Sequence, residues 1–351
     1  MKKRWLTSVF EIAVTYMGTV VGAGFASGQE IRQFFSQNGA HAMWGIALTV
    51  VLFFAFGVYA LSLGPRHGVR TFTELTQKKL GQRSGALVNA LLMVTIFGLN
   101  VAMIAGGGTL LRQVFGWPLY IGTLICVWTT LLLLLFGIRG IILANSLIVP
   151  FMLLWVFVSS SYFLSLLHSV AWHAPSHPVG HLAPLWQTVL AFSYLGFNVG
   201  LSLPVLVPLG ALHSHPRARL FGSAFGATGL GALMILIHLL LVNAHDLTLQ
   251  DIPMATIASV LPPIMRSSVL IAIGAEIYST LIANAFGFAN ELAEILNRKF
   301  FDMLLLSLVV AYAFAQVGFS RIVAWFYPTF GVFGCLLLFL FMVQEIRNLH
   351  V

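Results

Sequence analysis

Charged residues are scarce in this sequence: they make up 8% of its 351 residues, whereas hydrophobic residues make up 59%. Soluble globular domains carry about 25% charged residues, so the composition excludes that class. Apolar stretches of the length that spans a bilayer, about 20 helical residues, recur along the whole chain. The composition therefore predicts an all-α integral membrane protein that forms a single transmembrane domain over residues 1–351.

Cysteines and catalytic motifs are also scarce. The two cysteines, Cys126 and Cys335, lie within apolar stretches, so no disulfide framework is indicated. There is no His-Glu-x-x-His motif, and the glycines of residues 22–28 do not follow a predicted strand, which excludes a dinucleotide-binding fingerprint. Ser27 has no nucleophile elbow around it. We therefore expect neither an enzyme nor a bound cofactor.

Ten apolar stretches are candidate transmembrane segments, with approximate bounds 8–35, 42–64, 84–112, 118–137, 140–167, 185–209, 219–243, 266–296, 302–318 and 322–344. With the N-terminus in the cytoplasm, fourteen of the eighteen Lys and Arg residues fall inside and four fall outside. This bias predicts a multi-pass protein of the cytoplasmic membrane with both termini in the cytoplasm. The net charge of +8 then reports orientation in the lipid bilayer, and no nucleic-acid partner is expected.

The first segment is interrupted between Gly18 and Glu30, where the sequence reads GTVVGAGFASGQE. Glycine costs about 1 kcal/mol relative to alanine in a helix interior, so this run is a poor continuous helix. Unwound backbone persists within a bilayer only where it lines a cavity or is buried in protein. A broken first segment is therefore a pointer to the binding site of a transporter.

The sixth segment carries a similar interruption, because residues 192–200 read FSYLGFNVG and Pro204 and Pro208 follow. Ten segments divide into two sets of five, and an odd number in each half forces the halves into opposite orientations. We therefore predict a 5+5 inverted repeat, over about 8–167 and 185–344, with segments 1 and 6 discontinuous. The alternative is close helix packing, since the glycines of segment 1 also form small-xxx-small pairs.

The two interruptions define a predicted substrate site. Unwound helix ends expose N–H groups that suit a substrate carboxylate and carbonyl groups that suit a small cation. We expect the aromatic side chains among these residues to pack around the apolar part of the solute. The predicted wall comprises Gly22, Ala23, Gly24, Phe25, Ala26, Ser27, Ser193, Tyr194, Phe197 and Asn198.

A carboxylate in the eighth segment is the second functional candidate. Glu276 lies near the middle of the segment, where an ionised side chain is costly and usually marks an ion or proton pathway. Ser279 and Thr280 add two neutral oxygens, which could join backbone carbonyls around a sodium ion. The alternative is a protonated Glu276 hydrogen-bonded to a neighbouring helix, with the hydroxyls bonded to their own helix.

Two charged positions follow the first interruption. Glu30 and Arg32 lie on its short outer half and would form either an external gate or an interfacial charge pair. Four histidines occur in the external loop 168–184, where a zinc site is conceivable but a solvated loop is expected, because no cysteine or paired carboxylate accompanies them.

The run Gly18 to Glu30, with Phe34, Phe35 and Asn38-Gly39 after it, closely resembles the start of the bacterial YkvI family of membrane proteins. That family is assigned to the amino acid–polyamine–organocation superfamily, so the resemblance implies a membrane transporter.

More distantly, the chain resembles sodium symporters of the LeuT fold. By that similarity Gly18 and Val21 would give carbonyls, and Ser279 and Thr280 hydroxyls, to a sodium ion. Arg32 resembles the external gate arginine of those symporters, although no acidic residue within 322–344 matches its partner. Glu276 stands where they have a small residue, which implies a proton-linked or altered cation site.

These observations predict a secondary transporter that works by alternating access. Its expected substrate is a small amino acid or related organic solute, and its expected coupling ion is Na+ or H+. The rival interpretations are a channel or uniporter without a coupling ion, and a membrane sensor or partner subunit that transports nothing.

Overall fold

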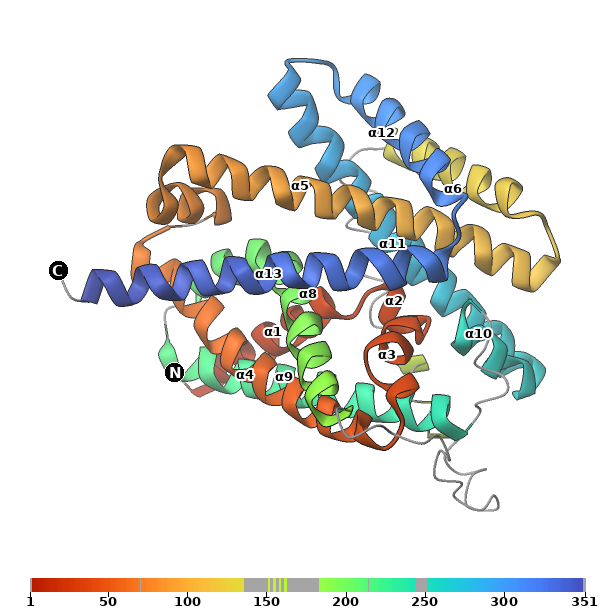
Figure 1. The fold of residues 1–351 in the computed structure, drawn as a ribbon, viewed down its shortest axis with the longest axis horizontal. Helices are drawn as coiled ribbons and strands as arrows, with labels where there is room; N and C mark the ends of the chain where they lie inside the picture. The colour runs from red at the N-terminus through yellow and green to blue at the C-terminus, as the bar shows by residue number, and fades with distance from the viewer. Residues whose placement is uncertain are drawn as a thin grey trace.

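The computed structural model describes residues 2–69, 71–135, 183–213, 215–243 and 251–349, together with a few isolated positions between 151 and 162. Every regular element within these ranges is helical (Figure 1). In chain order these are α1 (Lys2–Val20), α2 (Ala23–Ala26), α3 (Gln29–Phe34), η1 (Ser36–His41), α4 (Ala42–His67), α5 (Phe72–Phe115), α6 (Leu119–Leu134), α8 (Ala183–Leu212), α9 (Pro216–Asn243), α10 (Pro253–Ile257), η3 (Ala258–Val260), α11 (Pro263–Leu296), α12 (Phe300–Ala315) and α13 (Phe319–Leu349).

Six of the described helices are long and apolar enough to cross a membrane, namely α4, α5, α8, α9, α11 and α13. The apolar helices α6 and α12 are shorter, with 16 residues each. Large apolar side chains such as Trp325 and Phe339 lie exposed on the outside of α13, as lipid contact requires. The chain is thus a multi-pass membrane protein. The predicted segment 140–167 and the histidines of 168–181 lie outside the described residues, so the number of ten segments stays a prediction.

The helices pack as two groups (Figure 1). Helices α1, α4, α8 and α9 pack against one another, and we call them the bundle group. Helices α5, α6, α11 and α12 do the same, and we call them the scaffold group. Helix α13 packs against α8 of the bundle group and against α5 of the scaffold group. Within the bundle group, the buried Tyr16 hydroxyl of α1 donates to the Phe53 carbonyl of α4 at 2.8 Å.

The helical backbone of the first segment stops where its glycines begin. Helix α1 ends at Val20, Gly22 is extended (φ −128°, ψ −170°), and the four-residue α2 starts at Ala23. A second turn at Gly28 separates α2 from α3 with a left-handed φ of 77°, which favours glycine. Helix α10 packs over this turn, since the Met254 N–H donates to the Ser27 carbonyl at 3.0 Å.

The predicted break in the sixth segment is wrong in this structure, because α8 runs without interruption from Ala183 to Leu212. Its glycine instead permits a close helix crossing. A Cβ added to Gly196 would collide with the Gly331 carbonyl of α13, and one added to Gly334 would collide with the Gly196 carbonyl. Asn198 donates its side-chain N–H to the Tyr194 carbonyl at 2.9 Å, one turn back within the intact helix. Close packing, the alternative weighed above, therefore explains the sequence pattern in α8.

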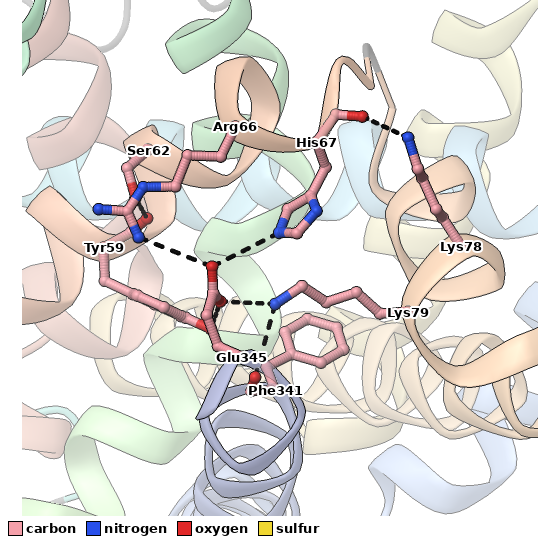
Figure 2. A network of polar contacts seen from close by, with 8 residues as sticks. All are labelled: Tyr59, Ser62, Arg66, His67, Lys78, Lys79, Phe341 and Glu345. Atoms are coloured by element: carbon pink, nitrogen blue, oxygen red, sulfur yellow. Dashed lines mark hydrogen bonds and ion pairs between the residues drawn. The ribbon is translucent and has the colours of Figure 1, made fainter. Parts of the chain in front are cut away.

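Near the C-terminal end of α13, the carboxylate of Glu345 connects α13 to α4 and α5 (Figure 2). Glu345 of α13 accepts from Lys79 at 2.6 Å and from the Tyr59 hydroxyl of α4 at 3.2 Å. Arg66 and His67, at the end of α4, lie 3.6 and 3.5 Å from its other oxygen. Lys79 belongs to a short first part of α5, which a non-helical Gly81 (φ 79°) separates from the long span.

Candidate functional site

A cavity of about 350 Å³ lies between the bundle and scaffold groups, at the interruption of the first segment. The bundle side contributes the end of α1, the broken backbone and one face of α8, and the scaffold side contributes α5 and α11. Its lining consists of Gly18, Thr19, Val20, Val21, Gly22, Ala23, Gly24, Glu30, Leu99, Met103, Phe197, Leu201, Val205, Glu276, Ser279, Thr280, Ala283, Asn284 and Tyr327.

The structure brings many of the predicted site residues to this one cavity. They come from segments 1, 6 and 8, which are far apart in the sequence. Those that line it are Gly18, Val21, Gly22, Ala23, Gly24, Glu30, Phe197, Glu276, Ser279 and Thr280.

The other predicted residues of segment 1 do not line the cavity. Phe25 and Ala26 are buried in α2, and the Ser27 hydroxyl donates to the Gly24 carbonyl at 2.9 Å. These positions follow the part of the interruption that faces the cavity and pack into the surrounding helices instead.

The other predicted residues of segment 6, Ser193, Tyr194 and Asn198, do not line the cavity, and the geometry of α8 explains why. On the continuous α8, Phe197, Leu201 and Val205 are four residues apart and form one stripe toward the cavity. Tyr194 and Asn198 lie on another side of the helix and are buried in protein. Ser193 shares the stripe but lies one turn beyond Phe197, where its hydroxyl donates to the Pro328 carbonyl at 3.3 Å.

Glu30 lies at the cavity and is 3% exposed. Its carboxylate rests against Gly24, where an added Cβ would collide with it. The Tyr194 hydroxyl donates to Oε2 of Glu30 at 3.2 Å. Arg32, two residues on, is turned by about 200° around the helix and lies within the electrostatic influence of Asp251. Glu30 therefore lines the cavity itself, on a different side of α3 from Arg32, and the external gate formed by the two residues stays a prediction.

Glu276 of α11 is 4% exposed and lines the same cavity. Within the part of the chain that the structure describes, its Oε2 has no hydrogen-bond partner. The alternative of a Glu276 held by a neighbouring helix therefore gains no support at this oxygen. Thr280 and Asn284 follow at intervals of four residues, so the three side chains share one face of α11.

Sequence reasoning missed Tyr327 of α13. Its ring stacks on Phe197 with a centroid distance of 4.2 Å and an interplanar angle of 17°. Its hydroxyl is buried and has no hydrogen-bond partner among the described residues. Nothing near Tyr327 in the sequence indicates this role. Asn284, by contrast, could have been found from its spacing to Glu276.

The exposure of the lining residues shows on which side the cavity opens. Gly18 and Val205 are exposed, and Asn284 is partly exposed, whereas Glu30 and Tyr327 are buried. The cavity thus opens toward the N-terminal side of the break and is closed on the side of α3.

Helix α10 helps to cover the closed side. Besides the Met254 contact with the Gly28 turn, Asp251 pairs with Arg112 of α5 and accepts from the Ser320 hydroxyl of α13 at 2.7 Å. The segment before α10 is thereby bound to both α5 and α13.

No protein-family model matches the chain. The chain is, however, 28% identical over 328 residues to the uncharacterized membrane protein YkvI of Bacillus subtilis strain 168, which covers 92% of both proteins. The chain is a relative of YkvI. This finding confirms the resemblance that the first-segment motif indicated. A second protein of that organism, the uncharacterized protein YyaD, is 25% identical over 335 residues and 95% of both chains.

The fold is shared with solved membrane transporters of low sequence identity. An inward-facing structure of Mhp1 matches 93% of this chain and 73% of its own with a TM-score of 0.64 and 15% identity. The Eremococcus coleocola manganese transporter, solved with an aromatic bis-isothiourea substituted compound, matches 88% and 70% with a TM-score of 0.59 and 16% identity. A closed structure of Mhp1, described as a nucleobase-cation-symport-1 family transporter with bromovinylhydantoin bound, matches 88% and 71% with a TM-score of 0.55 and 15% identity. These likenesses show that the chain shares its fold with these transporters.

Proposed function

We propose that this protein is a secondary active transporter of the cytoplasmic membrane, which moves a small amino acid or related organic solute by alternating access. The observation that carries the proposal is the cavity at the broken first segment, open on one side and covered on the other. A cavity at an interrupted segment near mid-span is typical of secondary transporters. The greater similarity to the inward-facing Mhp1 structure than to the closed one agrees with a one-sided opening.

Alternating access follows from the two groups of helices. The bundle and scaffold groups each pack mainly within themselves, and the cavity takes its walls from both. Rocking one group against the other would close the side of Gly18 and Val205 and open the side covered by α3 and α10. The positive-inside bias of the loops supports an orientation in which the open side and both termini face the cytoplasm.

The broken backbone supports the assignment of an amino acid-like solute. Helix α2 begins at Ala23 without a side-chain cap on the N–H groups of its N-terminus, and Gly22, Ala23 and Gly24 at this end line the cavity. Such groups suit a carboxylate. The stacked rings of Phe197 and Tyr327 and the apolar side chains of Leu99 and Met103 suit the apolar part of the solute.

Two ions are candidates for coupling. Gly18, Val21, Ser279 and Thr280 line one cavity, and their backbone carbonyls and side-chain hydroxyls would supply the neutral oxygens of a sodium site. Glu276 offers a proton acceptor on the same helix face as Thr280. Neither candidate requires a resident cofactor.

Uptake into proteoliposomes tests this proposal. The purified chain is reconstituted and given a panel of labelled amino acids, with sodium and proton gradients imposed separately. We expect uptake that follows one of the two gradients. Sodium-driven uptake that Ser279→Ala/Thr280→Ala abolishes supports the sodium site, whereas proton-driven uptake that Glu276→Gln abolishes assigns coupling to the carboxylate. Solute flux that ignores both gradients would instead establish a uniporter or channel, and no flux of any solute would favour a sensor or partner subunit.

A further inference from the structure

The charge of the cavity wall is one-sided. Two carboxylates, Glu30 and Glu276, line it, and no Lys, Arg or His occurs among the described residues of the wall. The two carboxylates come from different elements, α3 next to the bundle group and α11 of the scaffold group. Burying an ionised carboxylate in a low-dielectric site is costly unless a positive charge or a hydrogen-bond donor faces it.

Glu276 presents an unused acceptor to this space. Its side chain is 4% exposed, and Oε2 has no hydrogen-bond partner in the described part of the chain. Nearly all buried polar atoms in folded proteins have a partner, so such an atom on a cavity wall is an acceptor available to a bound molecule. The buried Tyr327 hydroxyl of α13, another lining residue, is unpartnered within the same ranges.

Glu30 is held in place by one hydrogen bond. The Tyr194 hydroxyl donates to Oε2, which orients the carboxyl group without placing a positive charge beside it. The other oxygen lies against Gly24 in the short helix α2 that follows the break, in space that a side chain at this position would fill. Both Gly24 and Glu30 line the cavity.

The remaining wall is suited to an organic molecule. Phe197 and Tyr327 present stacked rings, whose faces attract cations, and Leu99, Met103 and Leu201 are apolar. A small inorganic cation would leave these walls without a contact partner. The volume of about 350 Å³ is within the usual range for small-molecule pockets, about 300–1,000 Å³. The described residues also contain no group of three His, Cys, Asp or Glu side chains that could hold a metal ion.

We propose that the cavity recognises its solute through an ammonium group, with Glu276 and Glu30 as the counter-charges and the Phe197–Tyr327 pair against the adjoining hydrocarbon. This inference rests on the proposed transport function, since it takes the cavity as the place from which solute is carried. It narrows the solute to amines and amino-group zwitterions and excludes compounds whose only charge is a carboxylate.

Ligand binding to the purified full-length protein tests the proposal. The probes share carbon skeletons and differ in charge: leucinol and phenylalaninol carry only an ammonium group, leucine and phenylalanine carry both charges, and 4-methylpentanoate and 3-phenylpropanoate carry only a carboxylate. Sodium chloride, with potassium chloride as the matched salt, serves as the test for an inorganic cation. Binding is measured by isothermal titration calorimetry and by the shift in thermal unfolding.

We expect at least one ammonium probe to bind at least about tenfold more tightly than its carboxylate partner, as a charge-assisted hydrogen bond warrants. Glu276→Gln and Glu30→Gln should each weaken that binding by about tenfold or more. Glu291→Gln removes an exposed carboxylate from the same helix α11 and should leave it unchanged.

Three results would overturn the proposal: carboxylate probes binding as tightly as ammonium probes, no ammonium probe binding at all, or ammonium binding unchanged in both Gln variants. Sodium binding that is lost in Glu276→Gln, without any ammonium binding, would assign the carboxylates to an inorganic cation and would also overturn it. Failure of the transport function is recognised separately. If ammonium probes bind but no flux is measured in proteoliposomes, the recognition proposal stands and the transport function fails. If the Gln variants transport an anionic solute, the transport function stands and the recognition proposal fails.

Discussion

The Tyr194 hydroxyl of α8 donates a hydrogen bond to Oε2 of Glu30 in α3 across 3.2 Å, both side chains being buried. Tyr194 is itself fixed by aromatic contacts, with ring centroids 5.0 Å from Phe34, 5.3 Å from Phe35 and 5.8 Å from Phe53. The helix that was expected to be broken therefore acts as a rigid support. It positions the carboxylate on the wall of the cavity.

Tyr194→Phe tests this support. The ring and its packing stay, but the hydrogen bond to Glu30 is lost, which is worth about 1.5–3 kcal/mol when the acceptor is charged. We expect the KM for solute uptake to rise by about tenfold or more, together with a loss of stability no larger than the free energy of that hydrogen bond. Tyr312→Phe on α12, whose side chain lies away from the cavity lining, is the control. An unchanged KM would show that the bond does not position Glu30 for solute binding.

Gly24→Ala tests the close contact between the Glu30 carboxylate and Gly24 of α2. The added Cβ would occupy the position of Oε1, so Glu30 must move away from its present place on the wall. Uptake should fall by more than about tenfold, since small displacements of positioned groups reduce activity strongly. Gly287→Ala on α11, where an added Cβ meets nothing within 4 Å, should leave uptake unchanged. Normal uptake by Gly24→Ala would contradict the described position of Glu30.

Gly196→Ala tests the close crossing of α8 and α13. The Gly331 carbonyl occupies the position that the new methyl group needs, and backbone cannot move aside as a flexible side chain does. We expect a loss of about 1–3 kcal/mol in stability, seen as a lower unfolding temperature in detergent. If the helix were instead unwound at this residue, Gly196→Ala would leave the unfolding temperature near that of the wild type.

The Glu345 network makes a prediction about coupling between helices. The Lys79 side chain is 2% exposed and lies 2.6 Å from Glu345, so Glu345→Gln leaves a buried ammonium group with a weaker partner (Figure 2). Stability should fall by about 1–3 kcal/mol. In a double-mutant cycle with Lys79→Gln, the two losses should be less than additive. Strict additivity would mean that the two side chains do not interact in solution.

The sequence predicted the interruption of the first segment from the glycines of residues 18–28, because their effect on helix stability is local. It could not separate a break from a close crossing in α8, since both use glycine. A close crossing is distinguished from a break by the contacts of Gly196 with Gly331 and Gly334. These two residues are more than a hundred positions away in the sequence and meet α8 only in the folded chain.

The candidate site was predictable to a similar extent. Glu276 was found because a mid-span carboxylate is costly, and its spacing to Thr280 and Asn284 defines one helix face. Tyr327 was missed because its place opposite Phe197 depends on how α13 packs against α8. The orientation of Glu30 depends likewise on Tyr194, which no local pattern connects to it.

The most direct test of alternating access is to measure whether the two sides of the cavity become exposed in turn. In a chain with Cys126 and Cys335 replaced by alanine, Val205→Cys reports the open side, and Gln29→Cys, at a position 4% exposed, reports the covered side. Each variant is labelled with a membrane-impermeant maleimide in sealed vesicles, with and without the best-transported amino acid and its coupling ion. We predict that solute and ion change the two labelling rates in opposite directions, with Val205→Cys reacting from the cytoplasmic face and Gln29→Cys from the external face. Rates that ignore solute and ion, or two positions that react from the same face, would contradict alternating access through this cavity.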